Sequence, residues 1–246
     1  MSESAQRDWF RAWFGDEYLA VYPHRDAREA RAAVELYLCS APPPAGPVLD
    51  LACGAGRHLR ELLSAGLHAV GLDLSIVMLG KAREASPRSQ LVRGDMRRLP
   101  FRSSSFAGLT SFFTSFGYFA SSAQDRQAAA EMNRVLAPGG TFMLDFLHAD
   151  RVRRDLVPAE TGRIRGFELS VERRIEDDTV IKSIRMQPHD GSGEREFEER
   201  VRLYEPAVLE ELLREAGLDS RMRFGDYSGG DFDSDAGRLI LAGVAE

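Results

Sequence analysis

The residues whose types and spacing promise the clearest chemistry are an apolar run and the two glycines after it. Residues 48–51, Val-Leu-Asp-Leu, have the pattern of a short buried strand. Gly54 and Gly56 follow, and glycine tolerates positive φ and lets a backbone approach a ligand closely. A helix is expected from Arg57, and a helix N-terminus presents unpaired N–H groups. This strand, turn and helix predict a site for a nucleotide-like ligand at the carboxyl edge of a parallel sheet.

The surrounding residues narrow the choice of nucleotide. A dinucleotide fingerprint needs a glycine where Leu59 stands, and no Gly-Lys-Ser/Thr sequence follows for a Walker A loop. Asp73 ends the next expected strand, 19 residues after Gly54, where a carboxylate can accept hydrogen bonds from both hydroxyls of a ribose. Asp95 follows a third expected strand, where it could accept from an adenine amino group. A ligand held mainly by its pyrophosphate is therefore disfavoured.

The elements that must position these residues alternate along the chain. Strand patterns occur at 48–51, 68–73, 90–93, 106–113, 141–147 and 239–244. Helical patterns occur at about 25–39, 57–65, 76–84, 125–136 and 206–216. The prolines at 42–47 should end the first of these helices, and Pro138-Gly139-Gly140 should end the fourth. The alternation predicts an α/β fold with a parallel sheet and helices on both faces.

After Leu147 the pattern changes to period two with short turns, which predicts an antiparallel β-meander at 162–204 inserted into the α/β unit. We expect one domain over 1–246. It divides into a helical cover at 1–44, a ligand-binding core at 45–150, the meander at 162–204 and a return to the core sheet at 205–246. The meander is expected to roof a second pocket, with a dimerisation surface as the alternative.

Four motifs in order resemble the class I S-adenosylmethionine-dependent methyltransferases. They are Asp50-x-x-x-Gly54-x-Gly56, Gly71-Leu72-Asp73-Leu74-Ser75, Gly94-Asp95-Met96 and Leu136-Ala137-Pro138-Gly139-Gly140. Residues 203–218 resemble the C-terminal part of a small-molecule branch with a β-insertion, to which the glycine N-methyltransferase-like architecture is related. The resemblance implies a Rossmann-like sheet of seven strands in the order 3-2-1-4-5-7-6, with the seventh antiparallel. It also implies S-adenosyl-L-methionine as cofactor.

The resemblance implies a role for the N-terminal segment, which often covers the methionine end of the cofactor in this family. Arg25 is expected to pair with the methionine carboxylate and Tyr22 to donate to it, with Arg28 as a competitor. For Asp50, direct contact and contact through water both stay open. The cofactor-binding residues expected are Tyr22, Arg25, Asp50, Ala52, Gly54, Gly56, Asp73, Leu74, Met78, Asp95, Met96 and Phe112.

Aromatic residues follow the fourth expected strand, where the active site of this family opens. Their faces could line the pocket and attract a sulfonium cation. The residues expected at the acceptor are Phe113, Phe116, Tyr118, Arg202 and Tyr204. Methyl transfer depends on orientation, and a base is needed only if the acceptor must lose a proton. His148, Tyr118 and His24 are the candidates for that base, and no metal is implied.

Charge and composition weigh against other functions. The formal net charge is -6, and residues 151–204 interleave 12 basic with 12 acidic side chains, so no nucleic-acid footprint is indicated. No apolar run is long enough for a membrane span, and only two cysteines occur, which favours the cytoplasm. The leading hypothesis is N- or O-methylation of a small molecule by a monomer or homodimer. The alternatives are an RNA or protein methyltransferase, a non-catalytic cofactor-binding module and, more remotely, a nicotinamide oxidoreductase.

Overall fold

The computed structural model describes residues 8–22, 27–42, 44–164 and 166–246. Its core is a seven-stranded sheet in which only β11 runs antiparallel to its neighbours. In spatial order the strands are β10 (Leu218–Phe224), β11 (Arg238–Ala245), β5 (Leu136–Leu147), β4 (Phe106–Ser111), β1 (Val48–Leu51), β2 (Ala69–Asp73) and β3 (Gln90–Arg93). This confirms the order 3-2-1-4-5-7-6 with an antiparallel seventh strand.

The central position of β1 explains its apolar sequence, because all four of its residues are buried. In the parallel register, Asp50 lies opposite Gly71 of β2 and Thr110 of β4. The carboxyl ends of β1, β2, β3 and β4 therefore meet at one edge of the sheet, where the predicted ligand motifs lie.

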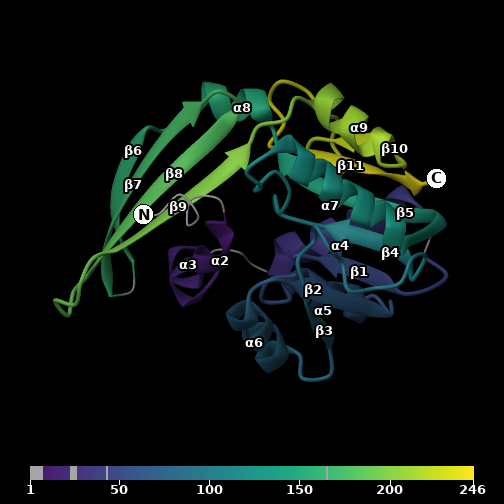
Figure 1. Cartoon of the computed structure of the whole chain (residues 1–246), viewed down its shortest axis with the longest axis horizontal. Coiled ribbons are helices and arrows are strands. Elements are labelled where there is room, and N and C mark those ends of the chain that lie inside the picture. Colours follow the sequence, from purple (N-terminus) through teal and green to yellow (C-terminus); the bar gives the residue numbers. More distant parts are fainter. Residues whose placement is uncertain (1–7, 23–26, 43, 165) are drawn as a thin grey trace.

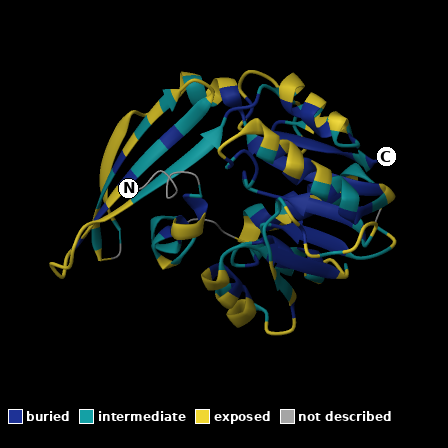
Figure 2. Cartoon of the chain, in the orientation of Figure 1, coloured by how far each residue is buried: buried dark blue, intermediate teal, exposed yellow. Residues whose placement is uncertain are grey.

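Helices cover both faces of this sheet (Figure 1). On one face α4 (Ala27–Ser40) packs against α5 (Arg57–Ser64), and on the other α7 (Ser122–Val135) packs against α9 (Pro206–Glu215). A further helix, α6 (Ile76–Ala85), lies against β2 and β3. Figure 2 shows the buried strands between helices whose outer sides are exposed. Among the residues that the structure describes, no helix is long and apolar enough to cross a membrane.

The meander forms a separate four-stranded antiparallel sheet, as expected. Its strands are β6 (Ala159–Ile164), β7 (Phe167–Glu176), β8 (Thr179–Pro188) and β9 (Arg195–Arg202). A short helix, α8 (Ala149–Arg154), leads into it from β5. Figure 1 shows α2 (Phe10–Trp13) and α3 (Asp16–Val21) between this sheet and the core.

Several boundaries differ from the sequence expectations by a few residues. Helix α7 ends at Val135 and β5 begins at Leu136, because Pro138 disfavours helix in the residues before it. The Pro-Gly-Gly sequence therefore lies within β5 and does not cap the helix. Strand β4 ends at Ser111, because Phe113 and Thr114 adopt left-handed backbone conformations with φ of 62° and 55°. The meander begins at Ala159, three residues before the predicted start.

Candidate functional site

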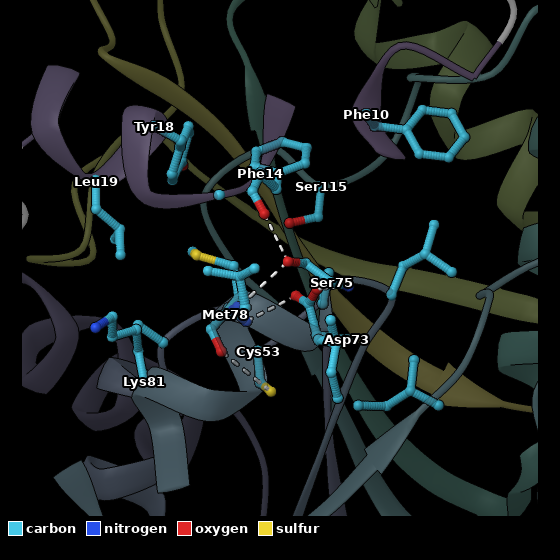
Figure 3. A pocket seen from close by; sticks show the side chains of 18 of the residues that line it. Phe10, Phe14, Tyr18, Leu19, Cys53, Asp73, Ser75, Met78, Lys81 and Ser115 are labelled. Atoms are coloured by element: carbon cyan, nitrogen blue, oxygen red, sulfur yellow. Dashed lines mark hydrogen bonds between the residues drawn. The ribbon is translucent and has the colours of Figure 1, made fainter. Parts of the chain in front are cut away.

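A cavity of about 810 Å³ lies at the carboxyl ends of β1, β2 and β3. Its lining includes the turn after β1, residues 72–78 from the end of β2 onward and residues 93–96 from the end of β3 onward. Residues of α2, of α3 and of the segment between them cover it, and Figure 3 shows Phe14 and Tyr18 of this cover near Asp73 and Met78. We call it the cofactor cavity. The predicted cofactor-binding residues that line it are Tyr22, Ala52, Gly54, Asp73, Leu74, Met78, Asp95, Met96 and Phe112.

The two glycines of the first motif serve different purposes. Gly54 has a φ of 55° and lines the cofactor cavity. Gly56 has a φ of 77° and stands beneath α6, where an added Cβ would lie 3.0 Å from the Cβ of Ala82. The expected direct contact between Gly56 and the cofactor is not supported, because this glycine is not among the residues that line the cavity. It is required for the left-handed turn and for close packing of the helices.

Asp73 organises the turn that faces the ligand. Its Oδ2 accepts the N–H of Gly54 at 2.8 Å, and its Oδ1 accepts the N–H of Ser75 at 2.8 Å. Burial raises the pKa of Asp73, although these backbone hydrogen bonds oppose the rise. Ser75 Oγ donates to the carbonyl of Phe14 at 2.5 Å, so the same turn holds the cover in place (Figure 3).

Asp95 lines the far end of this cavity, but its carboxylate is already engaged. Oδ1 accepts from Nε of Arg97 at 3.0 Å, and Oδ2 accepts from Nη2 at 2.7 Å. Burial alone would raise the pKa of Asp95, but the hydrogen bonds and charge of Arg97 outweigh it and lower that pKa. An adenine amino group would therefore have to share this carboxylate with Arg97.

Arg57 and His58 are lining residues that the sequence analysis missed. Arg57 pairs through Nη1 with Glu29, and its guanidinium lies 4.6 Å from the centre of the Phe113 ring. Its Nη2 is buried and has no hydrogen-bond partner among the described residues. The ring of His58 lies 4.6 Å from that of Phe112. The signal for both was their place directly after Gly56, at the helix N-terminus that faces the ligand.

A second cavity of about 560 Å³ lies between the meander and the core. We call it the acceptor cavity. Four aromatic residues line both cavities, which therefore meet there: Phe14, Tyr18, Phe113 and Tyr118. Its charged lining residues carry both signs: Arg151, Asp155, Glu160, Arg173, Lys182, Glu199 and Arg238.

The cover over the cofactor cavity is anchored in the meander. Trp13 is fully buried, and its Nε1 donates to Glu199 of β9 at 2.5 Å. The hydroxyl of Tyr22 donates to Glu199 at 3.0 Å and accepts a hydrogen bond from Lys182 of β8. Burial, followed by the charge of Glu199, raises the pKa of Tyr22. In this arrangement Tyr22 links the segment over the cofactor cavity to strands β8 and β9 of the meander, although it was expected to donate to the cofactor.

The turn between the cavities is held by a buried aspartate. Phe113 N–H donates to Oδ2 of Asp145 at 2.6 Å, and Thr114 N–H donates to the Asp145 carbonyl at 3.1 Å. Left-handed conformation costs about 1–2 kcal/mol for a residue other than glycine, so two in succession need such support. Burial raises the pKa of Asp145, and the charge of Arg238 opposes the rise.

His148 lies in the acceptor cavity, but both of its ring nitrogens are engaged. Nε2 lies 2.9 Å from the carbonyl of Asp233, and Nδ1 accepts the N–H of Arg151 at 3.4 Å, which caps α8. Proton transfer to His148 would have to break one of these contacts. Tyr118 also lines both cavities, and its hydroxyl donates to the carbonyl of Thr114.

Three residues expected at the acceptor lie elsewhere. Tyr204 is buried and donates to Asp125 at 2.8 Å, and Arg202 pairs with the same carboxylate at 3.3 Å. Phe116 is buried, with its ring 6.4 Å from that of Tyr204. None of the three lines either cavity: Tyr204 and Arg202 fasten the end of the meander to α7, and Phe116 lies beside Tyr204. His24 and Arg25 lie outside the described residues.

Asp50 is fully buried below the glycine turn and does not line the cofactor cavity. Thr110 Oγ1 donates to its Oδ1 at 3.4 Å, and its Oδ2 has no hydrogen-bond partner among the described residues. Burial raises the pKa of Asp50 to about 7. In the part of the chain that the structure describes, no group of three or more His, Cys, Asp or Glu side chains could hold a metal ion.

Comparisons with known proteins identify the family of the chain. Residues 48–140 match a family model described as a methyltransferase domain. The chain is 32% identical to the dTDP-3-amino-3,4,6-trideoxy-alpha-D-glucopyranose N,N-dimethyltransferase of Streptomyces venezuelae, over 77% of this chain and 82% of that protein. It is 37% identical to the demethylmenaquinone methyltransferase of Renibacterium salmoninarum, over 43% of each chain. A solved S-adenosylmethionine-dependent methyltransferase from Clostridium acetobutylicum shares the fold with a TM-score of 0.79 and 20% identity, over 92% of this chain and 94% of that one.

The fold, the glycine turn and these matches define a class I methyltransferase. The chain belongs to the S-adenosylmethionine-dependent methyltransferase family, and it is an enzyme that uses S-adenosylmethionine to methylate a small-molecule acceptor.

Proposed function

We propose that the enzyme methylates the amino nitrogen of a small polar molecule held in the acceptor cavity. The observation that carries this proposal is the state of His148, whose ring nitrogens are both occupied by the backbone. A hydroxyl oxygen is a weak nucleophile until a base takes its proton, whereas a neutral amine attacks through its lone pair and the resulting ammonium loses its proton to water afterwards. The N,N-dimethyltransferase relative, whose name specifies an amino sugar, supports an amine.

The described residues fit the cofactor along the whole cofactor cavity. Asp73 would bind the ribose hydroxyls, and Asp95 with Met96 would border the adenine. The buried Nη2 of Arg57 has no hydrogen-bond partner among the described residues, and a ligand carboxylate there would remove the cost of that missing bond. Arg57 therefore joins Arg25 as a candidate for the methionine carboxylate.

The residues of the chain contribute mainly by orientation. When bound, S-adenosylmethionine supplies a methyl group on a sulfonium that departs as a neutral thioether. The four aromatic residues shared by the cavities surround the passage between donor and acceptor, and their ring faces would stabilise positive charge there. The cover and the roof would exclude water and align the acceptor with the methyl group, which is where much of the rate enhancement arises.

The charges of the acceptor cavity favour a polar acceptor over a purely apolar one. Arg173 pairs with Glu160, and Arg151 lies 3.5 Å from Asp155, so both signs are available to a ligand. An amino sugar is the first class to test. The two free cysteines, Cys39 and Cys53, fit a reducing compartment such as the cytoplasm.

The test uses matched acceptors that differ only in an amino or a hydroxyl group. With S-adenosylmethionine and purified enzyme, mass spectrometry is expected to show methylation of the amine and none of the hydroxyl analogue. Methylation of the hydroxyl analogue alone would overturn the proposal.

A variant of His148 supplies a second readout. Asparagine is a good helix N-cap, so His148→Asn is expected to keep kcat within about threefold and leave its pH profile unchanged. Loss of an ionisation from the pH profile would show that His148 acts as the base.

A further inference from the structure

The turn that separates the two cavities is conformationally costly, and both of its left-handed residues donate to Asp145. Phe113 and Thr114 are both left-handed, which is especially unfavourable for the β-branched Thr114. Asp145 accepts both of their N–H groups, one on its carboxylate and one on its carbonyl. The turn is therefore not favoured by its own sequence and depends on Asp145.

Asp145 is in turn fixed by residues from the C-terminal part of the chain. Nη1 of Arg238 lies 2.9 Å from both carboxylate oxygens, and the hydroxyl of Tyr227 donates to Oδ2. Asp145 has no solvent exposure. Three donors thus converge on one buried carboxylate: an N–H of the turn, a phenol and a guanidinium.

The same network also clamps the ring of Phe113. The guanidinium of Arg238, which lines the acceptor cavity, lies 4.5 Å from the ring centre. The guanidinium of Arg57, which lines the cofactor cavity, lies 4.6 Å from it. Glu29 pairs with both arginines. Two guanidinium groups that share Glu29 therefore fix the position of the Phe113 ring, which is part of the wall of both cavities.

We propose that Asp145 is a positioning residue for methyl transfer, which holds the left-handed turn so that Phe113 keeps the passage between donor and acceptor open and aligned. Asp145 lines neither cavity and acts through Phe113 and Thr114. This inference rests on methyl transfer at the meeting point of the cavities, as proposed above. It predicts that loss of Asp145 affects turnover more than cofactor affinity.

The principal variant is Asp145→Asn, whose amide has a single acceptor oxygen for the three converging donors. We expect kcat for the amine acceptor to fall about 10- to 100-fold, because small misplacements of reacting groups have effects of this size. The affinity for S-adenosylhomocysteine, measured by calorimetry, is expected to stay within about threefold. Tyr227→Phe removes one of the three donors and keeps the ring, so it should lower kcat less. It also provides a milder test if Asp145→Asn fails to fold.

Rescue separates positioning from general stability. Glycine adopts the left-handed conformation at little cost, so adding Thr114→Gly to Asp145→Asn is expected to restore part of the lost kcat. The matched control is Asp125→Asn, which changes another fully buried aspartate bonded to a tyrosine and an arginine but lies away from both cavities. It is expected to lower the Tm without a selective loss of kcat.

A readout that needs no acceptor completes the test. With 4-fluorophenylalanine at position 113 only, the ¹⁹F spectrum of the S-adenosylhomocysteine complex is expected to shift or broaden in Asp145→Asn and to recover with Thr114→Gly. Unchanged ¹⁹F spectra in Asp145→Asn and Tyr227→Phe would overturn the proposal. A wild-type enzyme that methylates no amine would overturn the proposed acceptor class instead and would leave the ¹⁹F result to decide this inference.

Discussion

The two cavities of this methyltransferase are built by different means. The cofactor cavity rests on consecutive strand ends, and its central contacts are the Gly54 turn and Asp73, which bond to each other 19 residues apart. The acceptor cavity draws on the meander, the turn after β4, α8 and the last strand, and its wall depends on pairs such as Asp145 with Arg238, 93 residues apart. A cavity built on consecutive strand ends leaves a compact sequence motif, whereas a cavity built from distant segments leaves none.

This difference predicts that the two cavities can be disabled separately. Val180 and Val201 are register partners on β8 and β9, and both line the acceptor cavity. Val180→Trp should fill that cavity and lower kcat/KM for the acceptor more than about 100-fold, because a bulky ring excludes the substrate. Calorimetry should find S-adenosylhomocysteine affinity unchanged, with the exposed Val208→Trp on α9 as control. Full turnover by Val180→Trp would show that the acceptor does not bind in the acceptor cavity.

The converse variant addresses the cofactor cavity. Asp73→Ala should weaken S-adenosylhomocysteine binding by about 1.5–3 kcal/mol, or about 10- to 150-fold, because hydrogen bonds to a charged group are lost. Glu211→Ala removes an exposed carboxylate of α9 and should have no effect on the same calorimetric titration. Wild-type affinity in Asp73→Ala would place the ribose elsewhere.

A third variant tests the methionine end of the cofactor. Arg57→Met should weaken S-adenosylhomocysteine about 10-fold, but should not weaken methylthioadenosine, which lacks the amino acid group. Arg60→Met on the same helix, which also lines the cavity, is the matched control. Equal losses of affinity for both ligands in Arg57→Met would mean that Arg57 acts on the Phe113 turn alone. A selective loss of affinity for S-adenosylhomocysteine in Arg60→Met would mean that Arg60 binds the carboxylate.

A separate prediction concerns pH and the buried Asp50 below the cofactor cavity. Its pKa rises to about 7 in the fold, against about 3.9 in an unfolded chain. Between these values the folded state holds the extra proton, so the stability contribution of Asp50 is present at low pH and is lost as pH rises toward 7. Thermal melts should therefore show Asp50→Asn gaining stability relative to wild type between pH 5 and 8. A pH-independent difference would mean that Asp50 is already charged at pH 5.

The sequence analysis predicted the sheet correctly, and most of the residues predicted to bind the cofactor line one cavity, because the signals for both are local. Strand and helix periods fixed the α/β order, and the Gly54 turn with Asp73 located the cavity. Gly56 was interpreted as a ligand contact, since a sequence cannot show that its missing Cβ makes room for Ala82.

The acceptor side was less predictable because contacts there join distant segments. Tyr204 was expected at the acceptor, but its hydroxyl donates to Asp125 of α7. The sequence analysis did not identify Asp145, because nothing in an apolar strand sequence indicates that the side chains of Tyr227 and Arg238 converge on it. Arg57 was overlooked because an arginine in a helix is usually exposed.

The central claim is that donor and acceptor meet where Phe14, Tyr18, Phe113 and Tyr118 line both cavities. A crystal structure of the enzyme with S-adenosylhomocysteine and a methylated amine tests it most directly. We predict that the ribose hydroxyls bond to Asp73, that the sulfur lies among the four aromatic residues and that the amine nitrogen faces it from the acceptor cavity. A sulfur atom that points away from the acceptor cavity, or an amine bound outside the meander, would contradict the account.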